Sequence, residues 1–372
     1  MRCKISYVMN VVNGEPFLRY QLDSIYPHAH EIIIVEGAYT RYRHASTPDG
    51  HSLDNTVTII RNFPDPQNKI KLIQREGFWD DLCDMCNAFL PYVTGDVIWQ
   101  VDADEFYMPQ THEFVAEIMT TNLSLDRICF KTHDFYFSLN YELAGGIEDS
   151  GLSDIKRVHR YTPGDIWVTQ RPPTLGNTLG APKALRETIS GEEMALLGHF
   201  LYHPTVLFRH QFYNKFRYYR QLWPSIPQSD DWLNGIWNRF DNSINIMGLG
   251  TLATWIKPFT GPPAPQALKN LVSDVEAGHY PGYELRQNTD IESYLKSWQY
   301  PFDTFAGRCL NLIQIETRWQ RIPMILAAMV YVCFFAIFNY RREPGKFCWQ
   351  GLCATLERFV KKLTGHSREN PL

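Results

Sequence analysis

A cluster of acidic residues, Asp102-Ala103-Asp104-Glu105, stands directly after the apolar run 96–101. Glu36 likewise ends the apolar run 31–36. Carboxylate oxygens are the ligands that Mg²⁺ and Mn²⁺ prefer, and such a cation can lie between two carboxylates and a diphosphate that would otherwise repel one another. The pattern therefore predicts a bound Mn²⁺ or Mg²⁺ that stabilises the negative charge of a departing diphosphate.

These acidic residues can meet only if the apolar runs before them are parallel strands of one sheet. Apolar runs alternate with helical patterns, which predicts an α/β fold with a Rossmann-like, mostly parallel sheet and helices on both faces. The strands are expected at 5–12, 31–36, 69–74, 96–101, 127–137, 155–161 and 200–203. The helices are expected at 17–27, 56–63, 80–93 and 208–222, and irregular segments at 40–55 and 162–198. Ligands bind beyond the carboxyl ends of such strands, so Asn13, Glu36 and the acidic cluster should converge there.

The resulting domain is expected to cover residues 1–290, with a nucleotide-binding half at about 1–110 and an acceptor half at about 111–290. A helical C-terminal region, 291–372, should follow it.

Residues 1 to about 225 resemble the GT-A glycosyltransferases, in particular the family 2-like group. The matching motifs follow one another along the chain: Asn13-Gly14-Glu15, Glu36, Ser52-Leu53-Asp54-Asn55-Thr56, Asn87 and Asp102-Ala103-Asp104-Glu105. The resemblance implies a GT-A fold and transfer of a sugar from a nucleotide-sugar donor to an acceptor hydroxyl, with inversion of the anomeric centre.

The resemblance also implies roles for individual residues. The nucleotide would be bound by Asn13, Glu15, Glu36, Asp54, Asn87 and Asp102. The metal would be bound by Asp102, Asp104 and His203. Family members more often have Asp where this chain has Glu36, so this position departs from the pattern. Many GT-A enzymes use a histidine near the end of the domain as a ligand of the metal or the diphosphate. His199 and His210 are alternatives to His203 for this role.

An inverting enzyme needs a carboxylate that takes the proton of the acceptor hydroxyl. Glu192 and Glu193 are the candidate catalytic residues, and Glu187 and Asp134 are further candidates. The cations Lys215, Arg217 and Arg220 could contact a phosphorylated acceptor or the diphosphate, or could simply be surface cations with apolar stems.

The overall composition excludes some partners and favours a compartment. A net charge of −4 over 372 residues provides no basic field, so nucleic acid is not an expected partner. The eight cysteines lack the spacing of a disulfide framework, and the chain begins in a strand-like run, so we expect a cytoplasmic catalytic domain. The pair Cys83 and Cys86 is interpreted as structural thiols.

Two other functions are compatible with a related fold. A sugar nucleotidyltransferase would need a glycine-rich basic loop after the first strand, and Val11-Val12-Asn13-Gly14-Glu15 is not such a loop. A non-catalytic binding protein with a GT-A fold remains an alternative, against which the intact acidic cluster argues.

The apolar segment 322–338 is uncharged and lies between Trp319 and Tyr340. Aromatic residues in such positions are typical of membrane interfaces, so the C-terminal region is expected to bind the cytoplasmic face of a membrane. A buried core helix is the alternative, and because the tail after 338 is basic, shallow or re-entrant insertion competes with a full span. The expected partners are therefore a membrane surface, a nucleotide-sugar donor and a glycan or lipid-linked acceptor. Such an acceptor would belong to cell-envelope glycan or glycolipid synthesis.

Truncation of the chain after Gln314 tests the membrane hypothesis. The full-length protein should sediment with membranes and the truncated protein should remain in the supernatant, because the apolar segment and the basic tail are both lost. Equal solubility of the two forms would refute the hypothesis.

Overall fold

The computed structural model describes residues 2–145, 154–222, 226–241, 246 and 253–315. The chain divides into two compact units, Met1–Pro301 and Phe302–Leu372, whereas the sequence predicted a boundary after residue 290. The apolar segment 322–338 lies outside the described residues. Among the described residues, no helix is both long and apolar enough to cross a membrane.

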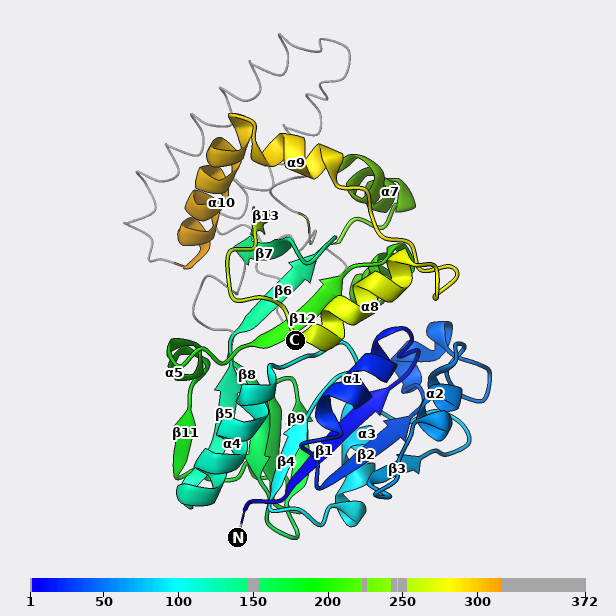
Figure 1. The fold of residues 1–372 in the computed structure, drawn as a ribbon, viewed down its shortest axis with the longest axis vertical. Coiled ribbons are helices and arrows are strands. Elements are labelled where there is room, and N and C mark those ends of the chain that lie inside the picture. Colours follow the sequence, from blue (N-terminus) through cyan, green and yellow to red (C-terminus); the bar gives the residue numbers. More distant parts are fainter. Residues whose placement is uncertain (1, 146–153, 223–225, 242–245, 247–252, 316–372) are drawn as a thin grey trace, which may run out of the picture. The chain divides into compact units, whose positions relative to one another are not determined.

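The larger sheet of the first unit has seven strands in the order β11-β5-β8-β4-β1-β2-β3 (Figure 1). Their bounds are β1 Ile5–Val11, β2 Glu31–Glu36, β3 Ile70–Ile73, β4 Val97–Gln100, β5 Leu125–Phe130, β8 Ile155–Arg160 and β11 Glu187–Ile189. Strands β4, β1, β2 and β3 are mutually parallel, and β11 is parallel to β5. Only β8 runs antiparallel to its two neighbours in this sheet, so the predicted mostly parallel sheet is confirmed.

Helices cover both faces of this sheet, as predicted (Figure 1). Helices α1 (Phe17–Ile25), α2 (Thr56–Asn62) and α4 (Pro109–Thr121) pack on one face, where Tyr7 of β1 stacks on Trp99 of β4 at 5.3 Å. Helix α3 (Leu82–Phe89) packs on the other face. Every residue of β2 is buried because both faces are covered, which explains its unbroken apolar run.

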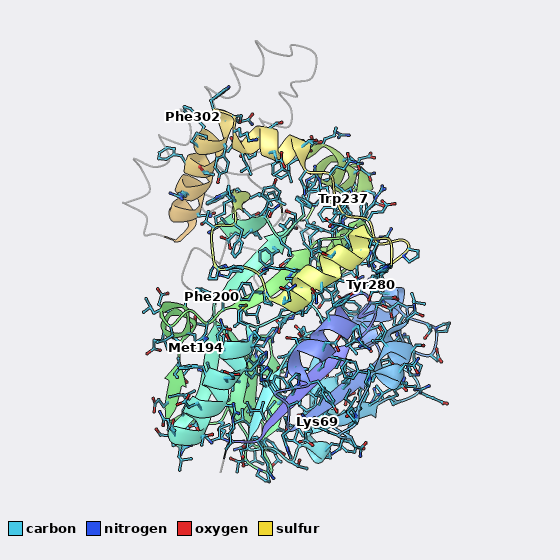
Figure 2. All side chains as sticks on the ribbon, in the orientation of Figure 1. Lys69, Met194, Phe200, Trp237, Tyr280 and Phe302 are labelled. Carbon is cyan, nitrogen blue, oxygen red and sulfur yellow. The ribbon has the colours of Figure 1, made fainter. Side chains whose placement is uncertain are left out.

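A second sheet of four strands has the order β12-β6-β7-β13. Its strands are β6 Thr132–Tyr136, β7 Tyr141–Gly145, β12 Leu201–Val206 and β13 Thr254–Pro258. Figure 2 shows side chains filling the space between its elements, and labels Phe200, just before β12, where the two sheets meet. Helix α6 (Arg209–Leu222) follows β12 directly.

The remaining elements complete the described chain. They are η1 Thr40–Ala45, η2 Leu90–Tyr92, β9 Ile166–Gln170, β10 Pro173–Gly176, α5 Gly191–Leu196, α7 Asp230–Arg239, α8 Gln266–Glu276, α9 Thr289–Leu295 and α10 Gln299–Ile315.

Three expectations about local structure are wrong. The single strand expected at 127–137 is two strands, because the chain leaves the larger sheet after β5 and enters the smaller one as β6. The segment 162–198 holds the hairpin β9–β10, strand β11 and helix α5, because its Pro and Gly residues separate short elements. The segment 40–55 begins with the 3₁₀ helix η1.

The packing of α1 on the sheet predicts a large difference between two leucine truncations. Leu18 is fully buried in the core beneath α1, whereas Leu179 is 91% exposed. Leu18→Ala should lower the free energy of unfolding by about 2–5 kcal/mol, because it removes buried methyl groups and leaves a cavity. Leu179→Ala should change it by less than about 0.5 kcal/mol. Urea unfolding followed by circular dichroism measures both, and equal effects would contradict this packing.

Candidate functional site

Two backbone pairings place the chemically important side chains together. Phe106 and Tyr202 form an antiparallel bridge, with hydrogen bonds of 2.9 and 2.8 Å, that joins the segment after β4 to strand β12. Strand β12 is also parallel to β6, in a register that sets His203 opposite Asp134. Because Asp104 precedes Phe106 and His203 follows Tyr202, the bridge brings Asp104 and His203 to the same place.

The side chains at this place form a connected cluster of two carboxylates and two cationic groups. Lys215 of α6 donates from Nζ to Oδ2 of Asp104 at 2.9 Å. His203 Nε2 lies 3.5 Å from the same oxygen, and His203 Nδ1 lies 2.7 Å from Oδ1 of Asp134. The hydroxyl of Thr205 donates to Oδ1 of Asp134 at 2.7 Å. We call Asp104, His203, Asp134 and Lys215 the Asp104 cluster.

The charges in the Asp104 cluster support one another. Burial alone would raise the pKa of Asp104, but Lys215 and His203 outweigh it and hold that pKa well below its usual range. Burial and the charge of Lys215 act to lower the pKa of His203, but Asp104 and Asp134 raise it to about 10. His203 is therefore an imidazolium between two carboxylates at neutral pH.

Asp102 and Glu105 face a different cation, Arg157 of β8, which the sequence analysis missed. Arg157 Nε donates to Oε2 of Glu105 at 2.9 Å, and its Nη2 donates to Oδ2 of Asp102 at 3.0 Å. Arg157 and Glu105 are both buried, whereas the side chain of Asp102 is 46% exposed. Arg157 thus holds the acidic segment through Glu105 and Asp102, separately from Lys215, and leaves Asp102 accessible.

The predicted metal ligands fit a divalent cation in part. The oxygens of Asp102 and Asp104 suit Mn²⁺ or Mg²⁺. His203 would first have to lose its proton, because a metal binds only the neutral imidazole. Among the described residues, no group of three or more His, Cys, Asp or Glu side chains is arranged to hold a metal ion.

Asn13 shapes the loop after η1. Its side chain donates from Nδ2 to the carbonyl oxygen of Ala45 at 2.5 Å and accepts from the backbone N–H of Leu53 at 2.7 Å. Its backbone N–H donates to the hydroxyl of Ser52 at 3.0 Å. Asn13 has a φ of +53°, a left-handed conformation that asparagine adopts more easily than most residues.

Hydrogen bonds connect the turn that contains Glu15 with the turn that contains Asp54. The N–H of Glu15 donates to Asp54 at 2.9 Å, and the side chain of Asn55 donates to Glu15 at 3.0 Å. The N–H of Thr56 donates to Asp54 at 2.9 Å and thereby fixes the start of α2. The structure thus brings the Asn13-Gly14-Glu15 and Ser52–Thr56 motifs together, as parts of one hydrogen-bonded unit.

Glu36 is fully buried at the end of β2, and both of its oxygens are occupied. Its carboxylate accepts from His51 Nδ1, from the backbone and hydroxyl of Ser52, and from Gln74 Nε2, each at 2.8 Å. Burial would raise the pKa of Glu36, but these hydrogen bonds lower it below its usual value. Glu36 therefore holds the loop that contains Ser52, which the longer Glu side chain can reach.

Asn87 is engaged with the backbone of the β9–β10 hairpin. Its Nδ2 donates to the carbonyl oxygen of Trp167 at 3.1 Å, and its Oδ1 accepts from the N–H of Trp167 at 2.8 Å. Both polar atoms of this amide thus connect α3 to β9, so the structure gives Asn87 a packing role.

The expected catalytic glutamates lie on the β11–α5 segment at the edge of the larger sheet (Figure 1). Glu193 forms a capping box with Ser190, whose hydroxyl donates to it at 2.7 Å. Glu192 is exposed in the first turn of the same short helix, and Glu187 accepts from Ser124 at 2.7 Å. Of the four candidate bases, only Asp134 joins the Asp104 cluster.

The other candidate residues have different surroundings. His199 stacks on Phe114 at 4.4 Å, and His210 contacts the ring of Tyr283 at 4.4 Å, so His203 is the histidine that meets Asp104. Arg220 pairs with Asp230 at 2.7 Å. The thiols of Cys83 and Cys86 are free.

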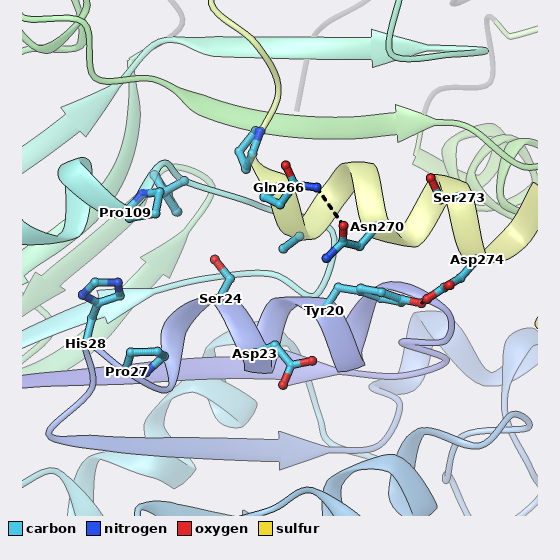
Figure 3. A pocket seen from close by; sticks show the side chains of 13 residues that line it. Tyr20, Asp23, Ser24, Pro27, His28, Pro109, Gln266, Asn270, Ser273 and Asp274 are labelled. Atoms are coloured by element: carbon cyan, nitrogen blue, oxygen red, sulfur yellow. Dashed lines mark hydrogen bonds between the residues drawn. The ribbon is translucent and has the colours of Figure 1, made fainter.

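A cavity of about 520 Å³ lies between α1 and α8 (Figure 3). Asp23 and Asp274 line it together with His28 and Asn270, and no Lys or Arg does. Arg19 pairs with Asp23 at 3.0 Å but does not line the cavity. A lining with two carboxylates and no Lys or Arg disfavours an anionic diphosphate, so the Asp104 cluster is the better candidate donor site.

The contacts of Glu36 predict a pH-dependent contribution to stability. Its folded-state pKa is lowered, so its stabilising effect is present above the ordinary Glu pKa of about 4.3 and is lost as pH falls through the folded value. At pH 7, Glu36→Gln should lower the free energy of unfolding by about 1.5–3 kcal/mol. The difference from wild type should shrink below pH 4 in urea titrations. The exposed Glu76→Gln is the control, and a pH-independent deficit for Glu36→Gln would count against this role.

Several solved structures are similar to parts of this chain. S. aureus TarS 1-349 is 19% identical, with 36% of this chain and 37% of that chain covered and a TM-score of 0.29. The mannosyltransferase PcManGT from Pyrobaculum calidifontis, in complex with GDP-Man and Mn²⁺, is 18% identical, with 35% and 36% covered and a TM-score of 0.28. Glucosyl-3-phosphoglycerate synthase from Mycobacterium tuberculosis, with Mn²⁺, UDP and glucosyl-3-phosphoglycerate, is 16% identical, with 35% and 43% covered and a TM-score of 0.25.

The chain spans less than half the length of each of these proteins, and at such TM-scores the likeness carries no argument about individual residues. No curated protein matches the chain. Residues 47–142 match the family described as "Glycosyl transferase family 2", a stretch that includes Asp54, Asn87, Asp104 and Asp134. The match supports the predicted resemblance and its enzyme class: residues 47–142 of this chain are similar to glycosyl transferase family 2.

Proposed function

We propose that this chain is a metal-dependent glycosyltransferase that moves a sugar from a nucleotide-sugar donor to an acceptor hydroxyl, with inversion. The observation that carries the proposal is the Asp104 cluster. Two of its members, Asp104 and Asp134, belong to residues 47–142, which match the glycosyl transferase family 2 model, and Lys215 and His203 contact Asp104 from outside that stretch. Its acidic segment follows β4, beside the carboxyl ends of β1 and β2, where ligands bind in α/β sheets.

In this proposal, Asp102 and Asp104 hold Mn²⁺ or Mg²⁺. The bound cation would supply positive charge to the diphosphate as the bond to the sugar breaks. Arg157 keeps the acidic segment in place through Glu105 and Asp102. Asp134 accepts a hydrogen bond from Thr205 and contacts His203, so its role is to orient that imidazolium beside Asp104.

The nucleotide part of the donor is proposed to lie against the loop 46–54. Asn13 and Glu36 bind this loop directly, and Glu15 and Asp54 fix the turn that follows it. The proposed contribution of these residues is to set the shape of the nucleotide-binding surface, since their polar groups are largely occupied within the protein. Preorganised surfaces of this kind bind ligands with less loss of conformational entropy.

The acceptor and the location of the reaction are proposed from the C-terminal sequence. The apolar segment 322–338 and the basic tail suit a catalytic domain held at the cytoplasmic face of a membrane. A glycan or lipid-linked acceptor in cell-envelope synthesis agrees with that location.

A binding assay tests the proposal without knowledge of the acceptor. UDP, GDP, CDP and ADP sugars are compared by thermal shift, first with Mn²⁺ and then with chelator. One nucleotide class should stabilise the protein only with metal, by about 2.7 kcal/mol at 100 times its dissociation constant. Asp104→Ala should abolish this shift, because it removes a carboxylate that holds the cation.

The matched control is Asp23→Ala, which removes an exposed carboxylate from the cavity between α1 and α8. It should leave the nucleotide shift unchanged. The proposal is wrong if no nucleotide stabilises the protein, or if Asp104→Ala retains the shift. Loss of the shift in Asp23→Ala alone would move the donor site to the cavity.

A further inference from the structure

Lys215 is a cation held in direct contact with the carboxylate that is expected to bind the metal. Its Nζ lies 2.9 Å from Oδ2 of Asp104 and 3.5 Å from Nε2 of His203. The side chains of Lys215 and Asp104 are only 20% and 21% exposed. Lys215 belongs to α6, whose residues Phe212 and Phe216 are buried, so the helix that presents Lys215 is anchored in the core.

A metal that binds Asp104 must compete with this ammonium. The ion pair is largely shielded from water, so displacing Lys215 leaves a poorly solvated charge without its partner, which is costly. The displaced ammonium needs another anion close to Asp104. A nucleoside diphosphate, bound to the same metal, brings phosphate oxygens to that position, and lysine is a common ligand of phosphate.

The other cations of the site are less suited to this exchange. Arg157 donates from both Nε and Nη2 to Glu105, and Nη2 also donates to Asp102, so two carboxylates hold its guanidinium. His203 is fixed from behind by Asp134 at 2.7 Å. Lys215 has a flexible stem and three donor hydrogens, so its head group can turn from a carboxylate to a phosphate with little rearrangement.

We propose that Lys215 is a counter-ion shared between Asp104 and the donor diphosphate, and that it couples the binding of metal and diphosphate. This inference rests on the proposed function. Metal alone must break the Lys215–Asp104 pair, and diphosphate alone must draw Lys215 away from Asp104. When both ligands bind, the pair is broken once and each charge finds a partner. Each ligand therefore increases the affinity for the other by the same factor.

The test measures Mn²⁺ binding by electron paramagnetic resonance, with and without the nucleoside diphosphate that stabilises the wild-type protein. In wild type, the diphosphate should tighten Mn²⁺ binding by about 10-fold or more, within the range typical of coupled sites. In Lys215→Met, Mn²⁺ alone should bind about 10-fold tighter than in wild type, because no ammonium competes for Asp104. Calorimetry at saturating Mn²⁺ should show weaker binding of the diphosphate to the variant, because the ammonium that would contact it is absent.

Lys257→Met is the matched control, since Lys257 also pairs with a carboxylate, Glu142 at 3.2 Å, but on β13. It should keep wild-type metal affinity and coupling. Lys215→Gln provides a second neutral side chain if Lys215→Met does not fold, and circular dichroism verifies both variants. Lys215→Arg should retain coupling, because it keeps the charge.

The outcomes separate this inference from the proposed function. If no nucleoside diphosphate binds wild type with Mn²⁺, both are overturned. If the diphosphate binds with Mn²⁺ but the neutral Lys215 variants keep wild-type Mn²⁺ affinity and coupling, only the role of Lys215 is overturned. Equal Mn²⁺ affinity of wild type with and without diphosphate also overturns it, whatever the variants show.

Discussion

The candidate site depends on the two backbone hydrogen bonds between Phe106 and Tyr202. They connect the chain that leaves the larger sheet after β4 to strand β12 of the smaller sheet. Asp104 and His203 lie close to this bridge, on separate segments, and their side chains approach to 3.5 Å. Both bridging side chains are completely buried, so the bridge is shielded from water, where backbone hydrogen bonds are costly to break.

Around this bridge, charges are balanced in two separate groups. Arg157 neutralises Glu105 and Asp102 on one side, and Lys215 and His203 neutralise Asp104 on the other. A buried charge that loses its partner costs about 3–5 kcal/mol, so each group is stable only as a whole. Asp102 is the more accessible carboxylate, with 46% of its side chain exposed, whereas Asp104 is 21% exposed and pairs with Lys215.

The sequence predicted those parts of the fold that produce strong local patterns. The buried runs before Glu36 and Asp102 were recognisable as parallel strands, and the acidic residues at their ends were correctly placed at one edge of the sheet. The capping box of Ser190 and Glu193 was also visible as Ser-x-x-Glu, a pattern that favours a helix start over a catalytic base. Helix α4 begins with Pro109, and proline favours the first position of a helix, so this start is also a local sequence signal.

The features of the site that the sequence did not predict depend on contacts between distant segments. Arg157 lies in a strand whose charged residues resemble those of an exposed edge, and only the pairing of β8 with β4 brings it to Asp102. Lys215 was recognised as a candidate cation, but its contact with Asp104 follows from the placement of α6 after β12. The most direct measurement is a crystal structure with Mn²⁺ and a nucleoside diphosphate, read by the anomalous signal of manganese. The account predicts a manganese peak bonded to a carboxylate oxygen of Asp104 and to the diphosphate; a nucleotide bound in the cavity between α1 and α8, with no metal at Asp104, would contradict it.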